Sequence, residues 1–118
     1  MNKIYETSLL LDFYGQLLTD RQYEILDLHY NNDFTLTEIA EQLNISRQGV
    51  YDNEKRGRAQ LIEYENKLGL LDKFSLQKQK AQNVQETMQK LKIDELSGEN
   101  KDIIKNVVTQ IEELVNNI

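Results

Sequence analysis

Apolar residues recur every three or four positions along most of this chain, a spacing typical of amphipathic helices. In the first half of the chain the repeats predict four helices, over residues 6–18, 20–31, 36–43 and 47–58. Thr19 and Gln22 form a capping-box pattern that would begin the second of these helices. The polar run from Asn31 to Asp33 predicts a loop after it.

The helical spacing continues beyond Gly57 and predicts one long helix over residues 58–92. Gly69 lies inside this segment and costs a helix about 1 kcal/mol relative to Ala, so a break near residues 69–74 is the alternative. A final amphipathic helix is predicted over residues 101–117. Its apolar positions form a regular stripe of Ile104, Val108, Ile111, Val115 and Ile118.

Residues 35–58 have the pattern of a helix-turn-helix. Thr35 and Glu38 are spaced as a capping box at the start of the first helix, and the small Ala40 would let the two helices cross closely. Asn44 tolerates the left-handed conformation that the turn requires, and Ser46 is a good cap for the second helix. The sequence therefore predicts a two-helix motif of the kind that often binds nucleic acid.

The composition fits a small helical protein without disulfides. The 118 residues are 39% hydrophobic, and the chain contains neither cysteine nor proline. We expect an all-α fold with a helix-turn-helix domain over residues 1–60 and a helical extension over residues 61–118. The lack of cysteine excludes thiolate metal sites and fits a reducing cytoplasm. No apolar run approaches the roughly 18 residues that span a bilayer, so neither a membrane segment nor a signal peptide is expected.

The charge distribution argues against strong binding to nucleic acid, except in one segment. The formal net charge is -6, which opposes the approach of phosphates. Residues 46–62 differ from the rest, because they carry four basic side chains against two carboxylates, whereas the segments on both sides are net negative.

Five side chains in this basic segment are candidates for nucleic-acid contact: Arg47, Gln48, Tyr51, Lys55 and Arg58. In a helix the spacing of four of them places Arg47, Tyr51, Lys55 and Arg58 on one face. Arg47 and Gln48 could reach base edges or 2′-hydroxyls, Tyr51 could stack, and the last two could contact phosphates. The same face could instead be simply solvated, or could bind a protein.

Other polar residues have structural interpretations. Asp52 and Arg56 are spaced to form an intrahelical ion pair, and Asn53 is expected to make a hydrogen bond within the fold. The single histidine, His29, has no second histidine or cysteine at ligand spacing. Paired carboxylates such as Glu63 and Glu65 are expected on solvated faces. We therefore expect no catalytic residue, no metal and no cofactor.

Residues 17–56 resemble the YlxM family of small bacterial helix-turn-helix proteins, with SRQGVYDN at residues 46–53 as the most specific part and LLTDRQ at 17–22 in support. That family is in turn similar to the C-terminal DNA-reading domain of primary sigma factors. The resemblance implies an all-α, non-enzymatic protein encoded alongside signal recognition particle genes. The particle's RNA, its GTPase or its receptor would be the partners. Gly49 and Tyr51 replace arginines of the sigma pattern, and Asp52 follows, which argues against sigma-style promoter reading.

Three functions remain open from the sequence. The leading one is an accessory factor of the signal recognition particle pathway that binds RNA or protein, and the alternatives are a DNA-binding transcriptional regulator and a protein-interaction adaptor. The long helix cannot bury its apolar side alone, so a homodimer is expected, with residues 61–91 and 104–118 in the interface. The alternative is a helical hairpin that folds back within one chain.

Overall fold

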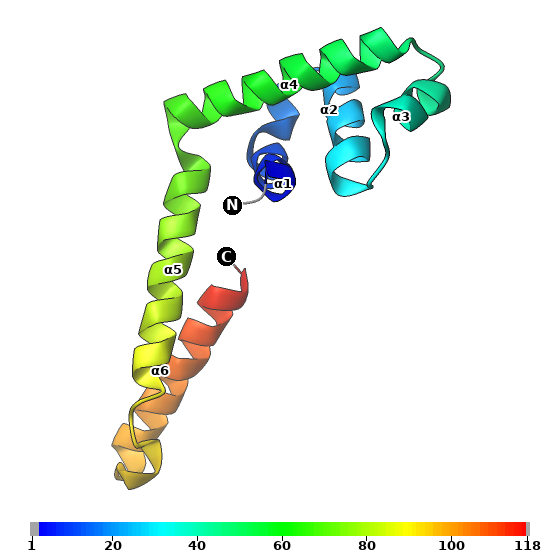
Figure 1. Ribbon diagram of the computed structural model, residues 1–118. Coiled ribbons are helices and arrows are strands. Elements are labelled where there is room, and N and C mark those ends of the chain that lie inside the picture. The colour runs from blue at the N-terminus through cyan, green and yellow to red at the C-terminus, as the bar shows by residue number, and fades with distance from the viewer. Residues whose placement is uncertain (1–2, 118) are drawn as a thin grey trace. The chain divides into compact units, whose positions relative to one another are not determined.

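The computed structural model describes residues 3–117, and Figure 1 shows that this part of the chain consists of helices and turns, without a strand. The all-α class is therefore confirmed. The elements, in chain order, are α1 (Lys3–Tyr14), the 3₁₀ turn η1 (Gly15–Leu17), α2 (Asp20–Leu26), the π-helical turn η2 (Asp27–Asn31), α3 (Leu36–Leu43), α4 (Arg47–Leu68), α5 (Leu70–Met88), the 3₁₀ turn η3 (Ile93–Glu95) and α6 (Gly98–Asn117).

The chain divides into two compact units, one ending at Leu71 and one beginning at Asp72. The expected division at residue 60 falls inside α4, which continues to Leu68. Leu61 lies just beyond that expected division, and its fully buried side chain belongs to the core of the first unit.

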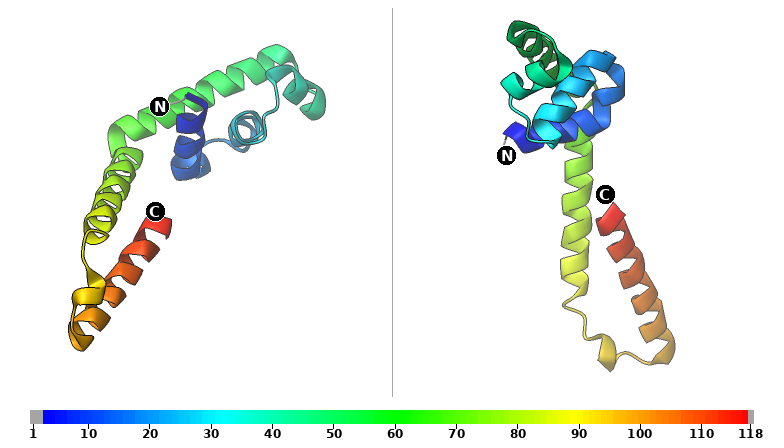
Figure 2. Two further views of the ribbon diagram at one scale, coloured as in Figure 1. Left: turned by 60° about the horizontal axis from the view of Figure 1, so that its bottom comes forward. Right: turned by 90° about the vertical axis from the view of Figure 1, so that its right-hand side faces the viewer.

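In the first unit, α1, α2 and α3 all pack on α4, as Figures 1 and 2 show. The largest fully buried side chains come from all four helices: Tyr14, Ile25, Leu26, Ile39, Val50 and Leu61. Each such side chain contributes about 1.5–3 kcal/mol by leaving water. This shared core holds α4 in a defined position relative to the three shorter helices.

Local capping sets the bounds of the helix-turn-helix. The capping box of Thr35 is present, since its hydroxyl accepts from the Glu38 amide at 3.1 Å and its own amide donates to the Glu38 carboxylate at 3.1 Å. Asn44 is left-handed with φ 55°, and the Ser46 hydroxyl accepts from the Gly49 amide at 2.9 Å. The helix predicted over residues 36–43 is confirmed, whereas the one predicted over residues 47–58 extends to Leu68.

The first two predicted helices both end earlier than expected, and α1 also begins earlier, at Lys3. The segment 6–18 contains the end of α1, which stops at Tyr14, and then η1. A Cβ at Gly15 would lie 2.8 Å from the Tyr23 ring, so the chain passes α2 closely at this point. The segment 20–31 is α2 followed by a π-helical turn, after which the Phe34 amide donates to the Leu28 carbonyl at 3.0 Å.

The single helix predicted over residues 58–92 is wrong, and the alternative of a break near residue 69 is confirmed. Gly69 is left-handed with φ 63° and ends α4. Tyr14 supports this break from α1, because its hydroxyl accepts from the Leu70 amide at 3.0 Å and donates to the Glu65 carboxylate at 2.6 Å. That carboxylate also accepts from the Leu71 amide at 2.9 Å, so Glu65 is not the solvated group that we expected.

The second unit is a helical hairpin in which the later part of α5 and α6 run antiparallel (Figures 1 and 2). Val108 and Ile111 of the predicted stripe line a cavity of about 60 Å³ together with Gln85 and Met88 of α5. Ile118, the last position of that stripe, lies outside the described residues. None of the side chains described after Leu71 is fully buried, so the hairpin has no closed core of its own.

Candidate nucleic-acid interface

Four of the five predicted contact residues form an exposed surface at the start of α4, the second helix of the helix-turn-helix. Arg47 is the first residue of α4, and Gln48 and Lys55 are also exposed. Tyr51 has 51% of its surface exposed, so its ring is accessible to a partner. We call these four residues, Arg47, Gln48, Tyr51 and Lys55, the α4 surface.

Arg58, the fifth predicted contact residue, differs from the α4 surface because it is bonded to a buried side chain. Its Nε donates to Oε1 of Glu54 at 2.9 Å, and the Tyr30 hydroxyl donates to the same oxygen at 2.6 Å. The Glu54 side chain is buried, and a buried carboxylate requires such partners. The hydrogen bond to Glu54 raises the pKa of Arg58, while burial, assisted by the same carboxylate, raises the pKa of Tyr30. Arg58 therefore compensates an internal charge.

Sequence reasoning missed this Tyr30–Glu54–Arg58 cluster, although the four-residue spacing of Glu54 and Arg58 was a usable signal. Tyr30 could not be assigned in the same way, because it approaches from η2. The cluster joins η2 to α4 and contributes to the fixed position of the helix that carries the α4 surface.

The exposed part of the basic segment remains positive after this internal pair is set aside. Without Glu54 and Arg58, residues 46–62 contain three positive charges and one negative charge. These charges belong to Arg47, Lys55, Arg56 and Asp52. The expected Asp52–Arg56 ion pair is not among those formed by the described residues. The Asp52 carboxylate instead accepts from Nε2 of the Gln48 side chain at 2.9 Å. Three exposed cations therefore lie on the first three turns of α4, beside one carboxylate that already has a hydrogen-bond donor.

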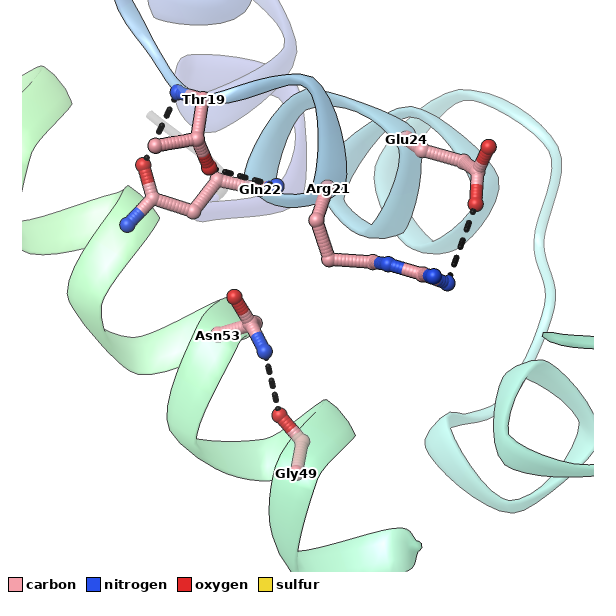
Figure 3. Close-up of polar contacts among 6 residues, drawn as sticks. All are labelled: Thr19, Arg21, Gln22, Glu24, Gly49 and Asn53. Carbon is pink, nitrogen blue, oxygen red and sulfur yellow. Dashed lines mark hydrogen bonds and ion pairs between the residues drawn. The ribbon is translucent and has the colours of Figure 1, made fainter. Parts of the chain in front are cut away.

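The packing of α2 fixes the opposite side of α4. Figure 3 shows Asn53 on the side of α4 that faces the start of α2, where Thr19 and Gln22 form the second predicted capping box. The side-chain Nδ2 of Asn53 donates to the Gly49 carbonyl at 2.8 Å. The expected hydrogen bond is therefore present, but its partner lies in the same helix. A Cβ at Gly57 would lie 2.8 Å from Leu26, which shows how closely α2 approaches α4.

Neighbouring charges on α2 add little to the α4 surface. Arg21 forms an ion pair with Glu24 at 3.5 Å, which Figure 3 also shows, and both side chains are about half exposed. Such a pair is worth about 0–1 kcal/mol in stability and leaves no net charge. The positive character of this side of the unit therefore comes from α4.

His29, the single histidine, has a structural role. Nδ1 of His29 donates to the Phe34 carbonyl at 2.7 Å and holds the loop before α3.

Within residues 3–117 no group of three or more His, Cys, Asp or Glu side chains could hold a metal ion. Across the same residues, no helix combines the length and the apolar character that a membrane crossing requires.

Comparison with known proteins identifies the family. Residues 1–101 match the family described as "Putative helix-turn-helix protein, YlxM / p13 like". A UPF0122 protein of Acetivibrio thermocellus is 58% identical over 115 residues, which cover 98% of each chain. A UPF0122 protein of Thermoanaerobacter sp. strain X514 is 43% identical over 107 residues, 91% of this chain and 92% of the relative. A UPF0122 protein of Halalkalibacterium halodurans is 46% identical over 90 residues, 76% of this chain and 83% of the relative.

These matches confirm the resemblance seen in residues 17–56 and extend it over most of the chain. A helix-turn-helix family points to a binding protein and suggests nucleic acid as the ligand. The chain belongs to the UPF0122 family of YlxM/p13-like helix-turn-helix proteins.

Proposed function

We propose that this protein is a non-enzymatic accessory factor of the bacterial signal recognition particle pathway that acts in the cytoplasm by binding RNA through the α4 surface. The observation that carries the proposal is the grouping of Arg47, Gln48, Tyr51 and Lys55 on the exposed start of the second helix of a helix-turn-helix. Cations can contact phosphates, an exposed ring can stack on an unpaired base, and Arg47 can reach a 2′-hydroxyl.

The chemistry of this surface favours RNA over base-specific reading of a DNA duplex. The Gln48 amide, which could pair with adenine in a major groove, already donates to Asp52. Asp52 also places a negative charge among the cations, and the net charge of -6 weakens the non-specific attraction on which duplex binders depend. A structured RNA with unpaired bases offers stacking contacts that tolerate this lower positive charge.

The link to the signal recognition particle rests on the family resemblance, and the particle's RNA or its GTPase is the partner that we propose. Arg58 belongs to the proposed surface only as a neighbour, since its Nε is bonded to buried Glu54. We further propose that the protein acts as a homodimer, which would present two copies of the α4 surface and raise avidity without new contacts.

The test is a fluorescence anisotropy titration of labelled signal recognition particle RNA, beside a random DNA duplex of equal length, at several salt concentrations. We expect tighter binding to the RNA, with an affinity that falls as salt rises. Arg47→Ala combined with Lys55→Ala should reduce RNA affinity by about tenfold or more, since each lost phosphate contact removes favourable counterion release.

The matched control is Lys90→Ala combined with Lys105→Ala, which removes two exposed positive charges from the second unit. This control should leave RNA affinity within about twofold, because neither lysine belongs to the α4 surface. A loss equal to that of the Arg47 and Lys55 variant would show that only the total positive charge matters. Preferred binding to the duplex would support the DNA-binding regulator instead. Absence of binding to both nucleic acids at low salt would overturn the proposal and make α4 a protein-docking surface.

A further inference from the structure

The hairpin of α5 and α6 exposes more apolar surface than a self-sufficient unit should. Leu76 and Val84 on α5 and Ile103, Val107 and Leu114 on α6 are large apolar side chains that remain exposed, Leu114 by 55% and Ile103 by 54%. The hairpin also has no fully buried described side chain and a cavity of about 60 Å³ between its helices. Helical segments of this size rarely hold a fixed structure without further burial.

Four of these exposed side chains, Val84, Ile103, Val107 and Leu114, gather on one face of the hairpin. At 3.6 residues per turn, Ile103, Val107 and Leu114 form a stripe about a quarter-turn from the side of α6 that lines the cavity. Val84 lies to the corresponding side of the cavity-lining positions of α5, whereas Leu76 lies almost opposite those positions, on the outer side of the helix. Because the two helices run antiparallel (Figure 2), Val84 and the stripe of α6 fall on the same face, which we call the apolar face.

The opposite face of the hairpin is polar throughout. By the same geometry it presents Gln82 and Glu86 from α5 and Lys105, Thr109 and Asn116 from α6. A simply solvated hairpin would have polar groups on both outer faces, since its apolar positions would be confined to the seam between the helices. The broader apolar arc is instead typical of helices in a four-helix bundle.

We propose that the apolar face binds the apolar face of a second copy of this chain, so that two hairpins form a four-helix bundle. This inference gives the interface of the homodimer in the proposed function, but its test does not depend on RNA. Charge complementarity indicates the occupant: α5 carries three lysines and two carboxylates, whereas α6 carries four carboxylates and two lysines. A second copy supplies the acidic helix for α5 and the basic helix for α6 at once.

This complementarity also selects the arrangement of the two copies. A two-fold axis parallel to the helices sets α5 opposite α6 of the partner, and all neighbouring helices are then antiparallel. A two-fold axis across the helices would instead set α5 against α5 and bring like charges together. In the first arrangement Lys80, at the edge of the apolar face, lies at a level where it can pair with Glu113 of the partner subunit.

The experiment is a measurement of mass by light scattering and of dimer affinity by sedimentation equilibrium on the full chain. We expect a mass of twice 13.9 kDa at micromolar concentration. Val107→Glu combined with Leu114→Glu should weaken the dimer by about a hundredfold or more, because two charges would be buried among apolar groups. Both residues are exposed in the single chain, so the substitutions remove no buried packing contact of the monomer, and circular dichroism should show that the helices of the first unit persist.

The matched control is Thr109→Glu combined with Asn116→Glu, which adds two charges at the same spacing on the polar face and should leave the dimer intact. Lys80→Glu and Glu113→Lys should each weaken the dimer about threefold to tenfold, and the double variant should restore it. A monomeric mass for the unaltered chain, or equal dissociation by the control pair, would overturn the interface. A double variant that stays as weak as the single ones would overturn the proposed two-fold arrangement.

A failure of the interface can be distinguished from a failure of the proposed function. A monomer that still binds RNA through Arg47 and Lys55 would overturn only the dimer. A dimer that binds no RNA would overturn only the role of the α4 surface.

Discussion

The two units of this chain are built from the same kind of amphipathic helix but bury it to very different extents. In the first unit, three helices pack on α4, and Ile25, Ile39 and Leu61 are completely removed from water. In the second unit, α6 is also clearly amphipathic, yet Ile103 and Leu114 stay exposed. Regular amphipathicity therefore predicts that a helix has an apolar side, whereas the number of neighbouring elements decides whether that side is buried.

Large-to-small substitutions should separate the two units most strongly. Ile25→Ala should lower the free energy of unfolding by about 2–5 kcal/mol, because it leaves a cavity in a fully buried site. Ile104→Ala, in the half-buried seam of the hairpin, should cost about 1 kcal/mol or less. Urea unfolding followed by circular dichroism measures both. Equal losses would show that the hairpin is as tightly packed as the first unit.

Removal of the buried carboxylate should have the next largest effect. Glu54→Ala should cost about 1.5–3 kcal/mol, because Tyr30 and Arg58 lose a shared acceptor in a buried position. Glu54→Gln keeps an acceptor oxygen and should cost less than Glu54→Ala. Glu86→Ala, on the polar face of the hairpin, should leave the urea midpoint nearly unchanged. A similar loss for Glu86→Ala would contradict the distinction between the units.

The break between α4 and α5 gives a smaller effect. Gly69→Ala should cost about 1–2 kcal/mol, since φ at this position is 63° and an L side chain is strained there even though a Cβ would meet nothing within 4 Å. Gly98→Ala is the control, because a Cβ at this position also lies in open space but within the ordinary helical conformation of α6. The control should keep or slightly raise stability, and a loss equal to that of Gly69→Ala would exclude backbone strain as the cause.

The alkaline limit of stability should also come from the first unit. Burial raises the pKa of Tyr30 above its ordinary value of 10.0, and a hydrogen bond to Glu54 adds to this shift. The unfolded chain therefore loses this proton at a lower pH than the folded chain, so the stability contribution is complete below pH 10.0 and decreases as pH rises above it. Tyr30→Phe should flatten that decrease in urea titrations between about pH 9 and about pH 11. An unchanged slope would contradict this assignment.

The helix-turn-helix was the most predictable part of the molecule. Thr35, Asn44 and Ser46 act on atoms no more than a few residues away, so their roles could be predicted from spacing alone. The α4 surface was predictable for the same reason, because the order of Arg47, Tyr51 and Lys55 along a helix determines that they share a face.

The contacts of Arg58, Glu65 and Gly69 depended on residues far away in the chain. Glu65 meets Tyr14 from α1, and Glu54 meets Tyr30 from η2, so neither carboxylate could be distinguished from a solvated one by its local pattern. The sequence allowed either a continuous helix or a break at Gly69. The Tyr14 hydroxyl, which accepts from the Leu70 amide, supports the break from a distant helix.

By itself, the sequence determined the helical class, the family, the helix-turn-helix and its exposed cations, because each of these depends on periodicity, capping or local spacing. Only the tertiary structure decided which charges point inward, where the long helical segment breaks and which apolar side chains of the hairpin remain uncovered. Burial depends on which elements surround a residue, and that information is distributed over the whole chain.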